Sequence, residues 1–356
     1  FYNKDKRNYV SRANVYVKMK DYEKAIRDYT HAILIDNQDS NAFLGRADAF
    51  RLQGNLDAAI KDYEAVANIM NGPNIGDGEI TDNKDQAAQA YNYKGEICRK
   101  QERYEEALIE FNNALRCNPK FIEAYFNRGI TYSDLHRRKE AIADFTQTID
   151  IILQKYKTTR HMNNEAVQII TETLIKDCYD KLLVAAFYRR GRNYYKLSMN
   201  DNAIQDYTRA IELDDQYALA YYFRAWIYRE EENYEKAIED YNKVLLVDNE
   251  NKEGYTYKSL KYRAFCYEKL SHYEKAIECY SETIEFRNEY AVNYLSRANL
   301  YLKFKKYKEA IQDYNYVILK DNKCYEAFLG RADAYRELGD LDSAISDYEK
   351  AMKLRK

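Results

Sequence analysis

The strongest constraint on the fold is a short pattern that the chain repeats nine times. An alanine is followed four residues later by Tyr or Phe, first at Ala25 and Tyr29 and last at Ala344 and Tyr348. Successive alanines are 34 residues apart in five intervals, and the other three intervals span 48, 62 and 39 residues. Twelve residues before each alanine stands another Ala or Gly. A chain of 356 residues with this period is predicted to form stacked repeats rather than two or three ordinary globular domains.

Small residues at these two positions allow two antiparallel helices to pack closely, and the aromatic residue fills the space between consecutive hairpins. The combined pattern resembles the tetratricopeptide repeat family. The resemblance implies an all-α fold, a right-handed superhelical solenoid of nine antiparallel helix hairpins that forms one domain over residues 1–356. The repeats are then expected at about 6–39, 40–73, 88–121, 122–155, 184–217, 218–251, 257–290, 291–324 and 325–356.

Two longer insertions interrupt the period. Residues 71–87 contain Gly72, Pro73, Gly76 and Gly78, so this segment is predicted to be an exposed loop. Residues 153–183 carry apolar side chains at helical spacing, which predicts extended helices. These helices either brace the molecule by covering each other or present an apolar face to a partner. We favour the brace.

The two ends of the chain resemble each other. Units one and two are closely similar to units eight and nine, and Phe1 to Asn3 align with Phe286 to Asn288 at the end of a helix. The chain also begins without Met. We therefore expect the sequence to be part of a longer array, and a targeting signal before Phe1 stays an open alternative.

A second regularity concerns charge. The residue before the small residue of the first helix is basic in all nine units, for example Arg46 and Arg224. The residue before the aromatic of the second helix is acidic in eight units, and the seventh unit has Cys279 opposite Arg263. These positions lie near each other in an antiparallel hairpin, so we predict a ladder of ion pairs along the solenoid. The alternative is that the arginines bind an anionic ligand.

The resemblance also implies a binding site, because first helices line a concave groove in this family. In units five to seven the groove positions are aromatic residues interleaved with Arg and Lys, which is typical of a binding hot spot. The predicted peptide-binding residues are Tyr188, Arg189, Arg192, Tyr195, Tyr222, Phe223, Trp226, Arg229, Lys261, Tyr262 and Phe265. Elsewhere the groove positions are small or polar, and Asn14 or Asn299 is expected to bond a peptide backbone. The alternative is that the tyrosines only fill a tightly wound groove.

We predict a non-catalytic protein–protein interaction scaffold that binds an extended, acidic peptide of another protein. One alternative is a structural subunit that docks through its insertion or flanks, and another is single-stranded RNA binding by stacking on the aromatics. The net charge of −2 argues against nucleic acid. A Lys and Asn clamp four residues apart, which relatives use for chaperone tails, is absent from these helices.

Other functional classes find little support in the sequence. The chain has only four histidines and no HExxH, GxSxG or GxxxxGK[ST] motif, so we predict no catalytic residues, metal, cofactor or small-molecule substrate. No apolar run approaches the roughly 18 residues of a membrane span. Six cysteines without a CxxC pair indicate free thiols and a cytoplasmic protein.

Overall fold

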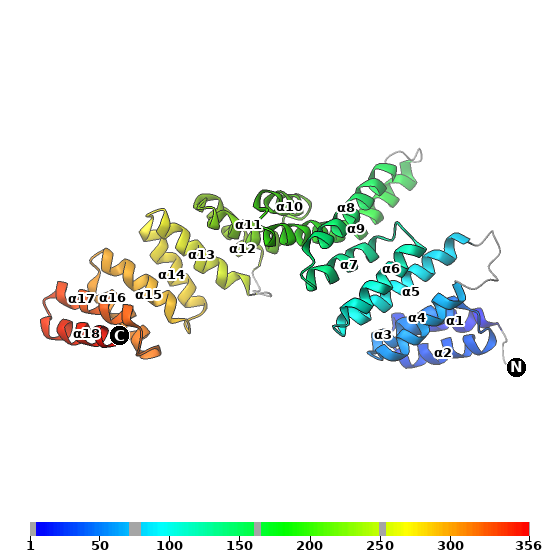
Figure 1. Cartoon of the computed structure of the whole chain (residues 1–356), viewed down its shortest axis with the longest axis horizontal. Helices are drawn as coiled ribbons and strands as arrows, with labels where there is room; N and C mark the ends of the chain where they lie inside the picture. Colours follow the sequence, from blue (N-terminus) through cyan, green and yellow to red (C-terminus); the bar gives the residue numbers. More distant parts are fainter. Residues whose placement is uncertain (1–4, 71–79, 160–164, 249–253, 356) are drawn as a thin grey trace. The chain divides into compact units, whose positions relative to one another are not determined.

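The chain forms helical hairpins throughout the part that the structure describes (Figure 1). The computed structural model describes residues 5–70, 80–159, 165–248 and 254–355, with the side chains of 80–83, 159 and 165–178 left out. The helices are α1 (Lys6–Lys18), α2 (Tyr22–Ile35), α3 (Ser40–Gln53), α4 (Leu56–Met70), α5 (Ile80–Lys100), α6 (Tyr104–Cys117), α7 (Ile122–Asp134), α8 (Arg138–Thr159), α9 (Glu165–Lys196), α10 (Asn200–Leu213), α11 (Ala218–Glu230), α12 (Tyr234–Val247), α13 (Tyr255–Lys269), α14 (Tyr273–Phe286), α15 (Ala291–Lys303), α16 (Tyr307–Lys320), α17 (Tyr325–Leu338) and α18 (Leu341–Leu354). Within α1 to α9 and within α10 to α18, consecutive helices pack against each other, as the repeat predicts.

The helices fall into two compact units, residues 1–199 and 200–356. The sequence predicts one continuous domain, and the boundary comes between α9 and α10, the two helices of the fifth repeat. The first unit contains α1 to α9 and the second contains α10 to α18. We treat each unit separately.

Close contact between small residues holds each hairpin together. In the hairpin of α11 and α12, Ala225 and Ala237 are fully buried in one cluster with Tyr241. The same three positions are buried in the hairpin of α15 and α16, as Ala298, Ala310 and Tyr314. The alanines let the two helices approach, and the aromatic ring fills the space beside them. The packing that the sequence pattern predicts is thus present in the second unit.

Each hairpin turn contains one residue of left-handed backbone, five residues before the conserved alanine position. Gly54 and Gly339 have φ angles of 93° and 84° there. Seven hairpins carry a residue other than glycine at this position, with φ between 57° and 61°: Lys20, Glu102, His136, Ser198, Glu232, Ser271 and Lys305. Because most of these residues are not glycine, the sequence alone does not predict the left-handed backbone at the turn.

The predicted ladder of ion pairs is present. Arg46, for example, donates from Nε and Nη2 to the carboxylate of Asp62 at 2.7 and 2.8 Å. The acidic partners are buried, so removing one charge of such a pair lowers the stability of the fold more than breaking a surface ion pair does. Equivalent pairs form between Arg12 and Asp28, Lys94 and Glu110, Arg128 and Asp144, Arg224 and Asp240, Arg297 and Asp313, and Arg331 and Asp347.

The ladder arginines also connect neighbouring hairpins, which the sequence analysis missed. Arg224 donates from Nη1 to Oγ1 of Thr208 in the preceding hairpin at 2.9 Å, and Arg297 donates to Ser281 at the same distance. The residue that accepts is always the one after the second-helix aromatic. Each of these guanidinium groups thus fixes both its own hairpin and the register of the next. This favours a structural role for the arginines over anion binding.

One expectation about loops needs correction. Residues 71–87 were expected to be a loop, but α5 begins at Ile80. The helix-breaking Gly and Pro residues all precede Ile80, so nothing prevents α5 from starting early. Asn14 and Asn299 accept hydrogen bonds from Tyr29 and Tyr314 through Oδ1, and the bonding of a peptide backbone by their amide N–H groups stays a prediction.

The second insertion lengthens α8 and α9, which pack against each other. Lys155 Nζ donates to the Tyr179 hydroxyl at 3.0 Å, and the Tyr156 hydroxyl donates to Asp180 Oδ1 at 2.9 Å. Ile152 and Leu183 are buried nearby along the two helices. In the described part of the insertion, side chains of α8 and α9 therefore contact each other, as a brace would.

Candidate peptide-binding site

The centre of the candidate site is a contact between α11 and α13. Trp226 and Arg229 stand one turn apart on α11, and Tyr262 projects from α13. The guanidinium carbon of Arg229 lies 4.2 Å from the ring centroids of both Trp226 and Tyr262. The two rings themselves meet edge to face at 5.3 Å. Contact with both rings holds the Arg229 side chain in place before any ligand arrives.

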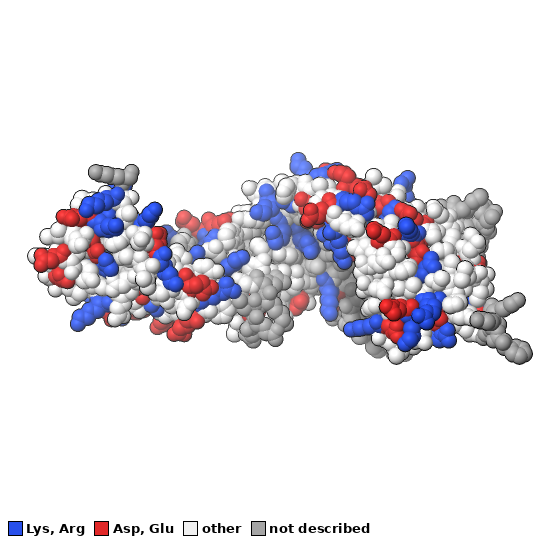
Figure 2. Space-filling model, turned by 90° about the horizontal axis from the view of Figure 1, so that it is seen from below, with Lys and Arg blue, Asp and Glu red and all other residues white. Residues whose placement is uncertain are grey.

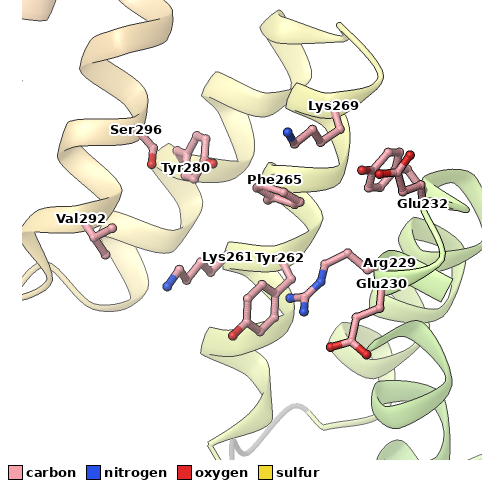
Figure 3. Close-up of a pocket in the computed structure, with 11 residues that line it drawn as sticks. Arg229, Glu230, Glu232, Lys261, Tyr262, Phe265, Lys269, Tyr280, Val292 and Ser296 are labelled. Carbon is pink, nitrogen blue, oxygen red and sulfur yellow. The ribbon is translucent and has the colours of Figure 1, made fainter. Parts of the chain in front are cut away.

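A pocket of about 540 Å³ opens next to this contact (Figure 3). Its rings are Tyr234 from α12, Tyr262 and Phe265 from α13, and Tyr280 from α14. Figure 3 shows Phe265 in the middle of the view, between Lys269 and Tyr262. Pockets of this size with an aromatic lining are common ligand sites. The rings offer an apolar surface on which a side chain of a partner can pack.

Charged groups surround the aromatic rings. Arg229, Lys261 and Lys269 provide three cations, while Glu230 and Glu232 provide two carboxylates. Glu230 Oε1 accepts the indole N–H of Trp226 at 2.7 Å, so this carboxylate is already engaged. The lining therefore carries one net positive charge, which favours an acidic segment over a basic one.

Several predicted residues turn out to belong to the core. Tyr222 is only 3% exposed and contacts Trp226, Tyr241 and Tyr255 through its ring. Burial raises the pKa of Tyr222, so its phenol stays protonated. Phe223 is half-buried and meets Tyr222 edge to face. For Tyr222, the alternative that some tyrosines fill the groove describes the structure better than an exposed contact does.

The other predicted residues lie on α9, in the first unit. Tyr188 is buried and accepts a hydrogen bond from Arg192 Nη1 at 3.0 Å. Arg189 lies over the ring of Phe126. Tyr195 is half-buried, with Lys196 over its ring. These four residues belong to the first unit and those of α11 and α13 to the second, so their common role in peptide binding stays a prediction.

Sequence reasoning named four of the eleven residues that line the pocket as peptide-binding residues. Among the others, Lys269 follows Phe265 by four residues on α13, so helical spacing alone puts it on the same face. Tyr280 had been assigned only to packing as the aromatic of the repeat. Ser296 comes from α15 in the next hairpin and is one of the small or polar groove positions expected outside units five to seven.

Charge over the surface is mixed. Figure 2 shows Lys and Arg interspersed with Asp and Glu over the visible face. Among the described residues, no group of three or more His, Cys, Asp and Glu side chains is arranged to hold a metal ion. None of the helices in that part of the chain combines the length and the apolar character that crossing a membrane would need.

The comparisons with known proteins agree with the hairpin architecture. Models described as tetratricopeptide repeats match residues 10–73, 122–154, 184–217, 218–251 and 295–355, and one described as a TPR repeat matches 95–135. Together these matches cover most of the chain. The protein belongs to the tetratricopeptide repeat family, whose repeats are typically non-catalytic and mediate protein interactions.

Individual relatives are more distant. A TPR repeat-containing protein of Methanocaldococcus jannaschii is 25% identical over 240 residues, which cover 56% of this chain and 42% of that protein. The Hsp70-Hsp90 organizing protein of Triticum aestivum is 28% identical over 195 residues, covering 39% of this chain and 34% of that protein. The chain thus spans less than half the length of these relatives.

A solved structure supports the fold alone. The C-terminal part of a TPR repeat-containing protein from Cytophaga hutchinsonii matches with a TM-score of 0.57 and 16% identity, over 78% of this chain and 95% of that one. The similarity extends over most of the hairpins and carries no information about a ligand.

Proposed function

We propose that the chain is a protein-interaction scaffold that binds an extended, acidic peptide segment of another protein at the pocket of α11, α13 and α14. The observation that carries this proposal is the pocket itself, which is lined by three cations and four aromatic rings. An acidic peptide with apolar side chains complements both features. The predicted role of the groove residues of α9, which lie in the first unit, stays a prediction.

The contacts within α8 and α9 do not favour the alternative in which the insertion docks on a partner. The described side chains there pair with one another. The interspersed charges of Figure 2 likewise give no support to RNA binding, which depends on a continuous basic surface.

A labelled peptide tests the proposal directly. The probe is a fluorescein-labelled, C-terminally amidated peptide of alternating Glu and Phe, compared with its Lys and Phe counterpart by fluorescence anisotropy. We expect the acidic peptide to bind and the basic peptide to bind at least about tenfold more weakly. Lys261→Glu combined with Lys269→Glu should abolish this preference.

The matched control is Lys308→Glu, on the exposed surface of α16 away from the pocket. It changes the net charge in the same direction and should leave the affinity nearly unchanged. Equal loss of affinity in Lys308→Glu would show that overall charge and not the pocket governs binding. Absence of binding by either peptide would contradict the proposed function.

A further inference from the structure

Two hairpins contain the same three-residue cluster in which one carboxylate serves two donors. In the hairpin of α3 and α4, Asp48 Oδ1 accepts from the Tyr63 hydroxyl at 2.7 Å and from Arg51 Nη2 at 3.0 Å. In the hairpin of α17 and α18, Asp333 Oδ1 accepts from the Tyr348 hydroxyl at 2.6 Å and pairs with Arg336 at 3.1 Å. The arginine follows the aspartate by three residues, and the tyrosine follows it by fifteen.

The hairpin of α11 and α12 keeps both donors and lacks the carboxylate. Arg229 and Tyr241 occupy the arginine and tyrosine positions, and Trp226 stands where the other two hairpins have aspartate. The spacing is the same, three and fifteen residues. The chain therefore preserves the binding partners of a carboxylate at a place where it supplies none.

Both donors lack an anionic partner among the described residues. Tyr241 is fully buried, and its hydroxyl has no hydrogen-bond partner there. An unsatisfied buried hydroxyl destabilises the fold, because it gave up its hydrogen bonds to water. In the same part of the chain Arg229 contacts the rings of Trp226 and Tyr262 and pairs with no carboxylate.

The two donors contact the same ring. The ring centroid of Tyr241 lies 6.2 Å from that of Tyr262, and the guanidinium carbon of Arg229 lies 4.2 Å from the Tyr262 centroid. Burial raises the pKa of Tyr241, and the positive charge of Arg229 opposes this shift. The phenol is therefore protonated and available as a donor beside a cation. The neighbouring pocket gives a ligand access to Arg229, which is one of the residues that line it.

We propose that a carboxylate of the bound peptide completes this cluster, held by Arg229 and Tyr241 in the place that Asp48 and Asp333 take in the other two hairpins. The inference rests on the proposed function, in which this pocket binds an acidic peptide. Arg229 and Tyr241 are then the residues that recognise the acidic group, because both donate hydrogen bonds to it. Lys261 and Lys269 then contribute charge at the rim.

Tyr241 is fully buried, so a ligand oxygen reaches its hydroxyl only when a neighbouring side chain moves. Trp226 packs against the cluster that contains Tyr241, and we expect its indole to turn aside and to give up its hydrogen bond to Glu230. Since Trp226 is the only tryptophan in the chain, its fluorescence reports this step. The carboxylate comes either from an acidic side chain or from the C-terminus of the peptide, and both present the same two oxygens.

Peptides that differ only in the acid test the proposal. The probes are the amidated peptide of alternating Glu and Phe and the same peptide with Gln in place of Glu. We expect the Gln peptide to bind at least about tenfold more weakly, and the Trp226 emission to shift only with the Glu peptide. A Gln peptide with free C-terminus that regains affinity would assign the carboxylate to the C-terminus. Equal binding of the amidated Glu and Gln peptides, with no gain from a free C-terminus, would overturn the inference while leaving the proposed function standing.

Stability measurements test the vacant carboxylate position without any ligand. Trp226→Asp restores the cluster within the chain, so it should melt at a higher temperature than Trp226→Ala and should lose the preference for the Glu peptide. Tyr241→Phe removes an unsatisfied hydroxyl and should leave the melting temperature unchanged or raised. The affinity of this variant for the Glu peptide should fall to that for the Gln peptide.

Tyr63→Phe is the matched control, because it deletes the hydroxyl that Asp48 already accepts. It should lower the melting temperature and leave peptide binding unchanged. A Tyr241→Phe variant destabilised as much as Tyr63→Phe would overturn the inference, as would a Trp226→Asp variant no more stable than Trp226→Ala. Failure of both peptides to bind would instead remove the proposed function.

Discussion

At the scale of single residues, each arginine of the ladder makes several kinds of contact with one side chain. Arg297 donates to Asp313, bonds Ser281 of the preceding hairpin and lies against the rings of Tyr294 and Tyr301. The planar guanidinium makes in-plane hydrogen bonds and ring contacts at once, which lysine cannot do. Aromatic residues three positions before and four positions after the arginine recur at Arg46, Arg128 and Arg331. These positions account for some of the 38 tyrosines in the chain.

The seventh hairpin lacks the acidic residue of the ladder, and its arginine finds other partners in the structure. Arg263 donates to Glu282 and to Asn242, while its buried Nε has no partner among the described residues. Cys279 occupies the place of the aspartate and is itself buried. Burial raises the pKa of this thiol, so it supplies no negative charge to Arg263.

Replacing this thiol should repair the ladder. Cys279→Asp gives Arg263 the bidentate partner that the other hairpins have, and we expect the free energy of unfolding to rise by about 1–2 kcal/mol. Chemical denaturation measures the change. The reciprocal variant Asp313→Cys leaves Arg297 without its carboxylate and should cost about 3 kcal/mol. A Cys279→Asp protein less stable than the parent would contradict this account.

At the scale of helices, each hairpin depends on the small residues that let its two helices touch. Ala225 and Ala237 are completely buried. A larger side chain at either position has to separate the helices or adopt a strained rotamer. The contact therefore tolerates little change, whereas the exposed helix faces tolerate much.

Ala237→Leu tests this contact. We expect it to lower the free energy of unfolding by about 1–3 kcal/mol, because the added methyl groups overpack the interface with α11. Thermal melting followed by circular dichroism gives the measurement. Ser343→Leu, at a half-buried position of α18, serves as the control and should change stability far less. An unchanged melting curve for Ala237→Leu would count against the helix contact itself.

At the scale of the whole molecule, the contacts are nearly all between neighbours in sequence. Helices pack against the next helix or the one after it. Stability in such an array is approximately a sum of hairpin and interface terms, so a local defect should remain local.

Hydrogen exchange can show this locality. Ala47→Leu overpacks the hairpin of α3 and α4 and should reduce amide protection in α3, α4 and the adjoining α5. Protection in α13 to α18 should stay as in the parent, because those helices belong to the second unit and Ala47 belongs to a cluster of the first. Loss of protection throughout the chain would show instead that the protein unfolds as one cooperative body.

The sequence determined the features that depend on one hairpin. The spacing of the alanine, the aromatic and the paired charges is set by helix geometry and a short turn, so the ladder between Arg224 and Asp240 follows directly from the pattern. The family assignment has the same basis. The insertion in α8 and α9 was also visible, because its apolar residues keep the helical period.

Only the tertiary structure decided the features that depend on how hairpins stack. It buried Tyr222 in the core and added Lys269 and Tyr280 to the pocket. It also showed that Arg229 and Tyr241 keep donor positions for which the described residues supply no acceptor. Stacking brings together residues that no fixed spacing links, because the packing of neighbouring side chains sets the distance between hairpins.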